Sequence, residues 1–339
     1  MKPATSSKRL YENTKLLFID SRQRTQEHSN FSNLKNYFRP GDLLVVNMSG
    51  TIPASFRFQK HNDQFEMRLA AFAGKNLNDF SVWQAVTFGQ GDWRIPTEGR
   101  TAAPVVEIGE VLKLSKTLEA RVIEVSSQNS RLLKIKFESK HLLRDLYKHG
   151  KPIQYSYLTE ELRIWDQQTI FSGPPISVEP PSAAFPLNWR MILDLQHSGV
   201  QVATIVHGAG LSSTGSAELD SELPLAEYFE IPDESFLKIK KALTERTRII
   251  AVGTTVTRAL ETAFSDVLNP RLRGLSSLKL GPASKLKVVN GLLTGMHEAG
   301  TSHLCLLSAF TGADTERLVA DNTSDYRSHE YGDSTLIMG

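Results

Sequence analysis

The chain has 339 residues, of which 40% are apolar and 22% are charged, a composition that excludes a disordered or fibrous protein. Its 39 lysines and arginines nearly balance 37 acidic residues, so the formal charge is only +2 and gives no indication of nucleic-acid binding through overall charge. The length is enough for two domains that each bury a core, which favours a soluble enzyme.

The only cysteine, Cys305, lies in an apolar run. An intrachain disulfide and a multi-cysteine metal site are therefore excluded, and we expect this residue to be a buried core thiol. The first residues contain no apolar signal segment, and no stretch reaches the roughly 18 apolar residues of a membrane span. We therefore expect a cytoplasmic protein without membrane contact, either a monomer or a weak homodimer.

Two short, strongly apolar runs, residues 16–20 and 42–47, are predicted to be buried strands of an α/β core. From about residue 55 to 140, short and often alternating runs are separated by Gly, Asn, Asp and Ser clusters. This pattern predicts a small antiparallel β-barrel inserted after the first strands. Residues 141–150 have helical spacing and end on glycine, so a helix leads the chain out of the insertion.

Helices and strands alternate in the second half. A helix is predicted over 188–199, with Asn188 as its N-cap, followed by a strand over 200–206. A second helix over 234–247 leads to a strand over 248–253 and then, through a tight turn, to another helix. The predicted fold is therefore α/β with two domains, namely a discontinuous α/β catalytic domain (1–54 and 151–339) and an inserted β-barrel domain (55–150).

The segment GTTVTRALE (253–261) is the first candidate binding motif. It would put Thr254 and Thr255 beside the exposed amides of a helix start, with Arg258 about one turn on. A carboxylate or phosphate would be stabilised there. The alternative is that a threonine caps the helix and Arg258 pairs with Glu261.

Two further segments contain glycine or histidine in suggestive patterns. HGAGLSSTG (207–215) would let a ligand approach the backbone closely, or would form a tight turn that needs positive φ. MHEAGTSH (296–303) begins like a zinc motif, but His297 and His303 are six positions apart. Because a helix would not present both to one metal ion, we expect no metal site.

Taken in order, these strings resemble the S-adenosylmethionine:tRNA ribosyltransferase-isomerases of queuosine biosynthesis over nearly the whole chain. The clearest matches are PGDLLVVN (40–47), RIIAVGTTVTRALE (248–261), LLSAFTG (306–312) and YRSHEYGDSTLI (326–337). The resemblance implies an α/β domain interrupted by a β-barrel, with S-adenosylmethionine as substrate. In that family the ribosyl part of S-adenosylmethionine is transferred to a deazaguanine aminomethyl group in the tRNA anticodon, with loss of adenine and methionine.

The resemblance also implies site residues. A sulfonium acidifies the adjacent C5′ hydrogens, so a positioned base can open the reaction. His297 is the first candidate for this acid/base work, with Glu227 and Asp333 as alternatives; a hydrogen-bonded structural histidine is the other interpretation of His297. The candidates for substrate binding are Asn47, Pro181, Ser182, Ala183, His207, Gly208, Gly210, Thr254, Thr255, Arg258, Tyr326, Arg327 and Tyr331.

The chain departs from the family pattern at several polar positions. The family's Asp-Thr-Arg is replaced at 48–50, and the arginine after its Ile-Pro-Ala is replaced by Ser55, so two arginines suited to phosphate or base contacts are missing. A family histidine would align with Val206, and two others are replaced by Glu222 and Leu225. These changes predict that S-adenosylmethionine binding is kept while the acceptor chemistry is altered.

Three functions follow. The first is a transferase-isomerase that consumes S-adenosylmethionine with a small acceptor. The second is epoxyqueuosine synthesis on deazaguanine-modified tRNA, which requires tRNA affinity that falls steeply with salt. The third is a non-catalytic binder that keeps the fold and the nucleoside pocket.

Overall fold

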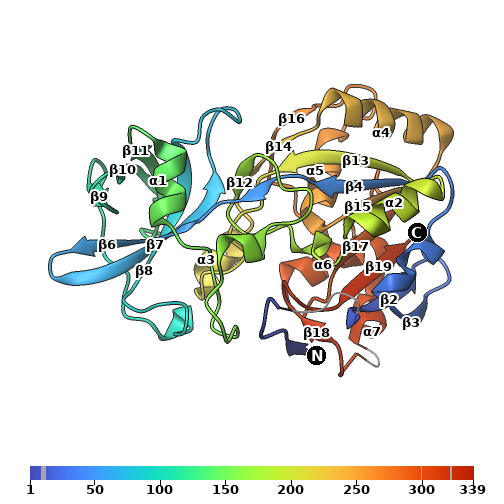
Figure 1. Cartoon of the computed structure of the whole chain (residues 1–339), viewed down its shortest axis with the longest axis horizontal. Coiled ribbons are helices and arrows are strands. Elements are labelled where there is room, and N and C mark those ends of the chain that lie inside the picture. Colours follow the sequence, from blue (N-terminus) through green and yellow to red (C-terminus); the bar gives the residue numbers. More distant parts are fainter. Residues whose placement is uncertain (9–12, 299, 321–322) are drawn as a thin grey trace.

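The computed structural model describes residues 1–8, 13–298, 300–320 and 323–339. A nine-stranded mixed sheet forms one end of the molecule and a six-stranded antiparallel sheet forms the other (Figure 1). The strands of the nine-stranded sheet, in sheet order, are β16 (Arg273–Ser276), β14 (Glu227–Glu230), β13 (Gln201–His207), β4 (Leu43–Asn47), β15 (Ile249–Val252), β17 (Gly291–Gly295), β19 (Ser334–Met338), β2 (Lys15–Asp20) and β3 (Thr25–Asn30).

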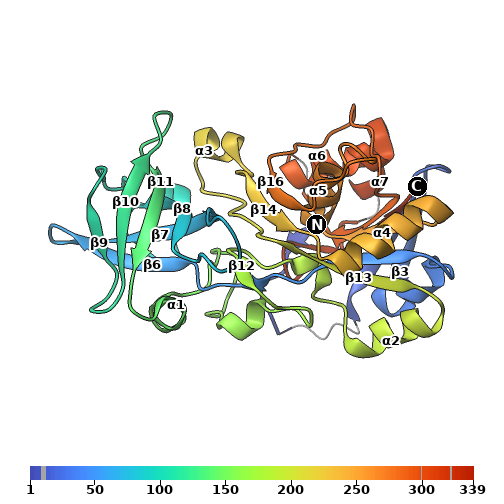
Figure 2. The ribbon, with the colours of Figure 1, turned by 90° about the horizontal axis from the view of Figure 1, so that it is seen from above.

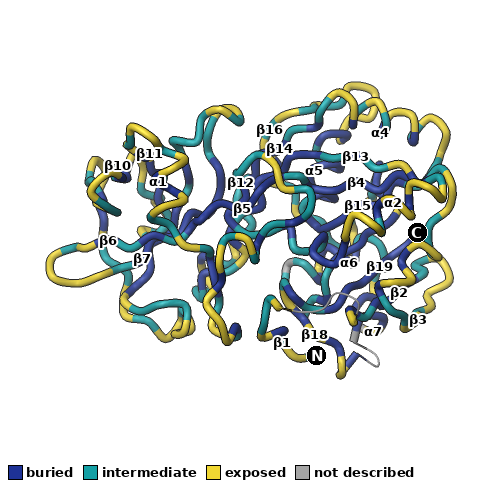
Figure 3. The backbone as a smooth tube through the Cα atoms, viewed as in Figure 1, coloured by how far each residue is buried: buried dark blue, intermediate teal, exposed yellow. Residues whose placement is uncertain are grey.

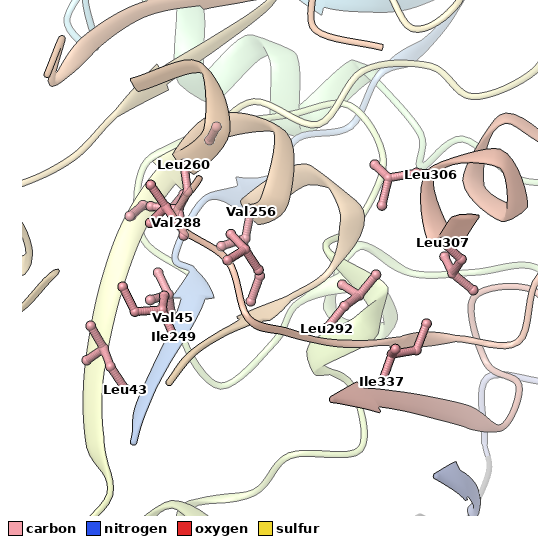
Figure 4. Packing of buried hydrophobic residues seen from close by; sticks show 14 of the residues in the cluster. Leu43, Val45, Ile249, Val256, Leu260, Val288, Leu292, Leu306, Leu307 and Ile337 are labelled. Atoms are coloured by element: carbon pink, nitrogen blue, oxygen red, sulfur yellow. The ribbon is translucent and has the colours of Figure 1, made fainter. Parts of the chain in front are cut away.

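The central strands β13, β4, β15 and β17 are parallel. Every residue of β4 is buried, as expected for a parallel strand covered on both faces. Successive side chains point to opposite faces: Leu43 and Val45 join one core cluster with helix α5, whereas Leu44 and Val46 join another with helix α2. Figure 4 shows the first cluster, in which Val256 and Leu260 of α5 lie over the sheet.

Helices cover both faces of this sheet. Helices α4 and α5 pack against β13 and β4 on one face, and α2 packs near β13 on the other. Buried residues are concentrated in the strands, and the outer surfaces of the helices are exposed (Figure 3). The α-helices are α1 (Leu142–His149), α2 (Trp189–His197), α3 (Ala217–Glu222), α4 (Asp233–Glu245), α5 (Thr254–Ala263), α6 (Ser302–Thr311) and α7 (Thr315–Ala320).

The six-stranded antiparallel sheet curls into a nearly closed barrel. One edge strand is linked to the residue that precedes the other by an ion pair in which Lys60 Nζ lies 2.7 Å from Glu110 Oε1. The interior is filled by large apolar side chains, among them Trp83, Phe56 and Phe72. In sheet order the strands are β6 (Ser55–Lys60), β7 (Asp63–Phe72), β8 (Val82–Phe88), β11 (Leu132–Glu138), β10 (Glu119–Val125) and β9 (Val111–Lys113).

The barrel sheet contacts the nine-stranded sheet through β7 and β14. The rings of Phe72 and Tyr228 meet edge to face with centroids 5.6 Å apart, and the Leu211 amide donates to the Ala70 carbonyl over 2.8 Å. The view from above places the barrel beyond the β14 side of the large sheet (Figure 2). Two short parallel pairs complete the structure: β5 (Gly50–Thr51) with β12 (Pro175–Ser177), and β1 (Lys2–Pro3) with β18 (Arg327–Ser328).

Most elements agree with the sequence predictions. The predicted helices 141–150 and 188–199 correspond to α1 and α2, and the Asn188 side chain accepts from the Met191 amide over 2.9 Å as an N-cap. The prediction for Cys305 is wrong: its side chain is exposed, because α6 turns Leu304 and Leu307 toward the core. In the described part of the chain, we find no helix of the length and apolarity that crossing a membrane requires.

A buried ion cluster lies beside Ser55 at the first barrel strand. The Glu66 carboxylate accepts from Ser55 Oγ over 2.6 Å and from Arg68 Nε over 2.8 Å, and it also contacts Arg100 Nη1. Burial favours the neutral acid, but the Arg68 and Arg100 guanidinium groups outweigh it and lower the pKa of Glu66 to about 2. Ser55, where the resemblance leads us to expect an arginine in the family, therefore lies next to two guanidinium groups from other positions.

Replacing Glu66 by glutamine should destabilise the chain by about 3–5 kcal/mol, because two buried cations lose their counter-charge. The wild-type carboxylate contributes stability above pH 4.5 that is lost as the pH falls toward 2, and Glu66→Gln should lack this acid dependence. Urea unfolding at several pH values measures both effects. The matched control is Glu138→Gln, which removes an exposed partner of Arg121; equal destabilisation by the two variants would contradict the account.

Candidate active site

The carboxyl ends of the four parallel strands meet at one edge of the nine-stranded sheet. Strand β4 ends at Asn47, β13 at His207 and β17 at Gly295, and β15 leads directly into α5. Strands β19 and β2 start at the same edge, because Ser334 pairs with both Gly295 and Leu16. Open α/β sheets bind ligands outside this edge. The fold therefore gathers residues predicted from distant parts of the sequence.

Asn47 fastens the ends of β4 and β13 together. Its Nδ2 donates to the His207 carbonyl over 2.8 Å, and its Oδ1 accepts from the amides of His207 and Ser49, both over 3.0 Å. The side chain is buried, so its hydrogen-bonding groups serve the protein itself. Asn47 therefore stabilises the backbone at the carboxyl ends of β4 and β13, which form this part of the sheet edge.

The loop after β13 lies against other backbone. A Cβ atom on Gly208 would come within 3.0 Å of the Ile176 carbonyl, and one on Gly210 within 2.8 Å of the Ala70 carbonyl. Gly208 and Gly210 do not have positive φ, whereas Gly215 at the end of the segment has φ of 71°, so the tight-turn alternative holds for Gly215 only. Gly208 and Gly210 permit close packing between β13, β12 and the barrel strand β7.

A buried ion pair joins this loop to α5. Glu227 Oε1 accepts from the Gly210 amide over 2.6 Å, and Oε2 accepts from Arg258 Nη1 over 2.5 Å. Arg258 also donates from Nε to the Leu278 carbonyl over 2.9 Å and from Nη2 to the Ser276 carbonyl over 3.4 Å. Burial raises the pKa of Glu227, although the Arg258 charge opposes this shift.

The alternative pairing of Arg258 with Glu261 is wrong. Glu261 instead accepts from three backbone amides, those of Lys287, Val288 and Val289, over 2.8 to 3.0 Å. The Glu261 carboxylate therefore holds the backbone of residues 287–289, shortly before β17, in place. Arg258 is left to bridge α5 and β14.

His207 lies beside the ion pair and is fully buried. Its Nε2 is 3.4 Å from Glu227 Oε2, yet neither ring nitrogen makes a hydrogen bond. Burial and the Arg258 charge lower the pKa of His207 to about 3, so the imidazole is neutral at neutral pH. The side chain of the neighbouring Val206 packs in the core cluster that includes the barrel interior. It points away from the His207 side chain because successive residues of a strand point to opposite faces.

The start of α5 faces a neighbouring turn. Gly253, with φ of 97°, forms the N-cap without a side-chain cap, so a threonine does not cap this helix. A Cβ atom on Gly253 would lie 3.5 Å from Ala183 Cβ. The 3₁₀ turn η5 (Ser182–Ala184), preceded by Pro181, thus lies against the helix start where Thr254 and Thr255 are found.

His297 follows the end of β17. Its Nε2 lies 2.8 Å from Thr294 Oγ1, and its ring stacks on His303 with centroids 4.9 Å apart. Burial, followed by the charges of His303 and His329, lowers the pKa of His297 well below its usual range. Over residues 13–298 and the other described ranges, we find no cluster of three His, Cys, Asp or Glu side chains that could hold a metal ion.

Asp333 is held by backbone amides at the same edge. Its Oδ1 accepts from the Lys15 amide over 2.7 Å and its Oδ2 from the Arg327 amide over 2.8 Å. It therefore holds the starts of β2 and β18 in place. The Arg327 side chain is exposed. An open depression of about 530 Å³ is lined by Ser6, Lys8, Asn13, Lys15, Asp325, Arg327 and Asp333.

The two predicted tyrosines dock this segment on the sheet. Tyr326 Oη lies 2.9 Å from His28 Nδ1, at the far edge strand β3. The Tyr331 ring stacks on Phe185 with centroids 5.2 Å apart, and its hydroxyl donates to the Asp166 carbonyl over 3.1 Å. Tyr331 therefore borders the η5 turn, whereas Tyr326 lies away from the Glu227–Arg258 pair.

Two polar residues near the ion pair were not among the predicted site residues. The six-residue spacing led us to expect that His297 and His303 do not meet, since a helix would not place the two rings together. Thr294 lies in an apolar strand pattern and carries no motif. The return of α6 over the end of β17 brings His303 to His297, whereas Thr294 lies three positions before His297 in the same segment.

Replacing His207 by leucine should leave stability at pH 8 nearly unchanged, since neither ring nitrogen has a partner to lose. Below pH 6.5 the His207 imidazole is protonated in the unfolded chain, whereas in the folded chain it stays neutral down to about pH 3. Wild-type stability should therefore fall by about 1.4 kcal/mol per pH unit more steeply than that of His207→Leu. Denaturant unfolding between pH 8 and 4 tests this, and identical acid slopes would contradict the assignment.

Comparison with known proteins identifies the family. The model of the queuosine biosynthesis protein family matches residues 2–337. An S-adenosylmethionine:tRNA ribosyltransferase-isomerase of Carboxydothermus hydrogenoformans is 30% identical over 334 residues, covering 96% of this chain and 93% of the relative. The enzyme of the same name from Natranaerobius thermophilus is 28% identical over 335 residues, covering 96% and 92%.

A solved structure agrees in fold. The crystal structure of S-adenosylmethionine tRNA ribosyltransferase from Thermotoga maritima covers all of this chain and is itself covered to 95%, with a TM-score of 0.52 and 21% identity. At that identity the match supports the fold alone. Taken with the family match and the relatives, the chain belongs to the queuosine biosynthesis family of S-adenosylmethionine:tRNA ribosyltransferase-isomerases.

Proposed function

We propose that the chain consumes S-adenosylmethionine at the carboxyl edge of the nine-stranded sheet, transferring or rearranging its ribosyl part with release of adenine and methionine. Family membership supports the reaction. The observation that carries the location is the convergence of His297, Glu227 and Asp333, from different elements, on this one edge. Ligands of open α/β sheets bind there.

The start of α5 is proposed to receive the methionine carboxylate. The first amides of a helix have no partner within the helix, and its dipole favours an anion. Thr254 and Thr255 add hydroxyl donors at the same place. Arg258 acts indirectly, because its guanidinium is committed to Glu227 and to two carbonyls.

The neighbouring segments are proposed to enclose the nucleoside. Pro181, Ser182 and Ala183 lie against the helix start, and the loop from His207 to Gly210 lies on the other side of the Glu227 carboxylate. Protein backbone already covers the faces of Gly208 and Gly210, so this loop is proposed to border the nucleoside rather than to receive the adenine ring on its glycines.

His297 is proposed to be the base. Each carboxylate of Glu227 and Asp333 already accepts two N–H groups, whereas His297 has one ring nitrogen on Thr294 and is kept neutral by burial. A proton leaving C5′ would pass to this imidazole, and its electron pair would remain on the carbon beside the sulfonium. Neutral imidazole is the form that can accept it.

The acceptor is proposed to be a small molecule, with tRNA as the second candidate. Ser55 replaces an arginine of the family pattern, and the nearby Arg68 and Arg100 side chains are each 1% exposed. These guanidinium groups are bound to Glu66 and do not meet the phosphates of a nucleic acid. The tRNA candidate is favoured by the names of the relatives, which describe enzymes that act on tRNA.

We further propose two domains, with the barrel domain (55–150) inserted into an α/β domain (1–54 and 151–339). The barrel strands all fall within the inserted range, and the strands of the large sheet all fall outside it. A metal-independent reaction, a cytoplasmic location and a monomer or weak homodimer complete the proposal.

The test is to incubate purified protein with S-adenosylmethionine, with and without deazaguanine-modified tRNA, and to follow adenine and methionine by mass spectrometry. The proposal expects both products. Release without tRNA supports a small acceptor, or a reaction that needs no acceptor. Release only with tRNA, with a ribosyl mass gain on the RNA, supports the tRNA candidate. Intact S-adenosylmethionine in both reactions, together with measurable binding, would favour a non-catalytic binder and contradict the proposal.

The same assay tests the base. Replacing His297 by glutamine should lower the rate about 10²- to 10⁴-fold, the usual contribution of a general base, with little change in S-adenosylmethionine affinity. His197→Gln, which changes an exposed residue of α2, is the matched control. A rate within a few-fold of wild type for His297→Gln would remove His297 from the mechanism.

A further inference from the structure

His303, in the first turn of α6, lies flat against His297. Their ring centroids are 4.9 Å apart and the ring planes differ by 11°. The two residues meet because the chain turns back between them: Gly300 has φ of 80°, and the Thr301 hydroxyl donates to the Glu298 carbonyl over 2.8 Å. On one continuous helix, positions six apart would face different directions.

The stack is the contact that orients the His303 ring. Across the described ranges, no hydrogen bond to the His303 ring is found, while His297 is held at one edge by Thr294 Oγ1 over 2.8 Å. A ring held by one hydrogen bond at its edge can still swing about that bond. A parallel ring on its face removes this freedom.

Charged or titratable groups around the pair come from α5, from the residue after β18 and from Glu298 in the segment of His297 itself. Arg258 of α5 lies on the His303 side, where burial and its charge lower the pKa of His303 to about 4. His329, after β18, lies on the His297 side, and its Nε2 is 3.5 Å from Glu298 Oε1. Both stacked imidazoles are therefore neutral at neutral pH, and they pack without charge repulsion.

We propose that His303 is a positioning residue for His297, whose stacked ring keeps Nε2 of His297 on Thr294 and leaves Nδ1 available to the substrate. The role rests on the proposed function, in which His297 accepts the C5′ proton. For Nδ1 to accept it, Nε2 must carry its own hydrogen and donate it to Thr294 Oγ1. The stack thus fixes the plane of the base, and the hydrogen bond to Thr294 Oγ1 that it preserves fixes the tautomer.

Two substitutions separate the flat ring from the imidazole. His303→Phe keeps a parallel ring, and His303→Ala removes it. Adenine release should fall about 10-fold or more in His303→Ala, mainly in kcat, because the base loses its orientation. His303→Phe should restore a rate within about threefold of wild type, and His197→Gln serves as the control. Equal losses in the two variants, or none in His303→Ala, would overturn the inference.

A second measurement needs no turnover. In ¹⁵N-histidine NMR spectra at neutral pH, with the His297 signal assigned from His297→Gln, wild type and His303→Phe should show one tautomer with hydrogen on Nε2. His303→Ala should show averaged tautomers. A single tautomer kept in His303→Ala would overturn the inference. The expected spectra would support it even if no adenine were released, so a failure of the proposed reaction would be seen separately.

Discussion

The buried ion pair between Glu227 and Arg258 is the contact on which the site depends. It connects β14 to α5, and each partner is further bound by backbone: the Gly210 amide on Glu227, and the Leu278 and Ser276 carbonyls on Arg258. Breaking such a pair leaves a buried charge unpaired, at a cost of about 3–5 kcal/mol. The ion pair therefore keeps the sheet edge at β14, the loop at Gly210 and helix α5 in one fixed arrangement relative to each other.

The same pair sets the electrostatics of the edge. The Arg258 charge, added to burial, keeps His207 and His303 neutral, and His303 in turn lies against His297. Neutral imidazoles suit a substrate that is itself a sulfonium cation, because a protonated histidine would repel it. The parallel strands supply the geometry, the ion pair holds it, and in the proposed reaction His297 takes up the proton.

Local patterns were enough to predict strands β2, β4, β13 and β15, the helices α1 and α2, the Asn188 cap and the barrel sheet, because these depend on nearby residues. Contacts between distant segments were not predictable in this way. Arg258 pairs with Glu227, 31 positions away, rather than with Glu261 one turn along; His303 meets His297 through a turn, and Arg68 and Arg100 gather on Glu66 beside Ser55. The expectation that Cys305 is buried is wrong because residue type alone does not tell which face of α6 the side chain occupies.

The central claim is that S-adenosylmethionine lies over the Glu227–Arg258 pair at the carboxyl edge of the large sheet. A crystal structure of the chain with S-adenosylmethionine tests it most directly. The account predicts the methionine carboxylate on the first amides of α5 beside Thr254 and Thr255, and C5′ within about 3–3.5 Å of the His297 ring. A ligand bound within the barrel, or at the edge with His297 out of reach of C5′, would contradict it.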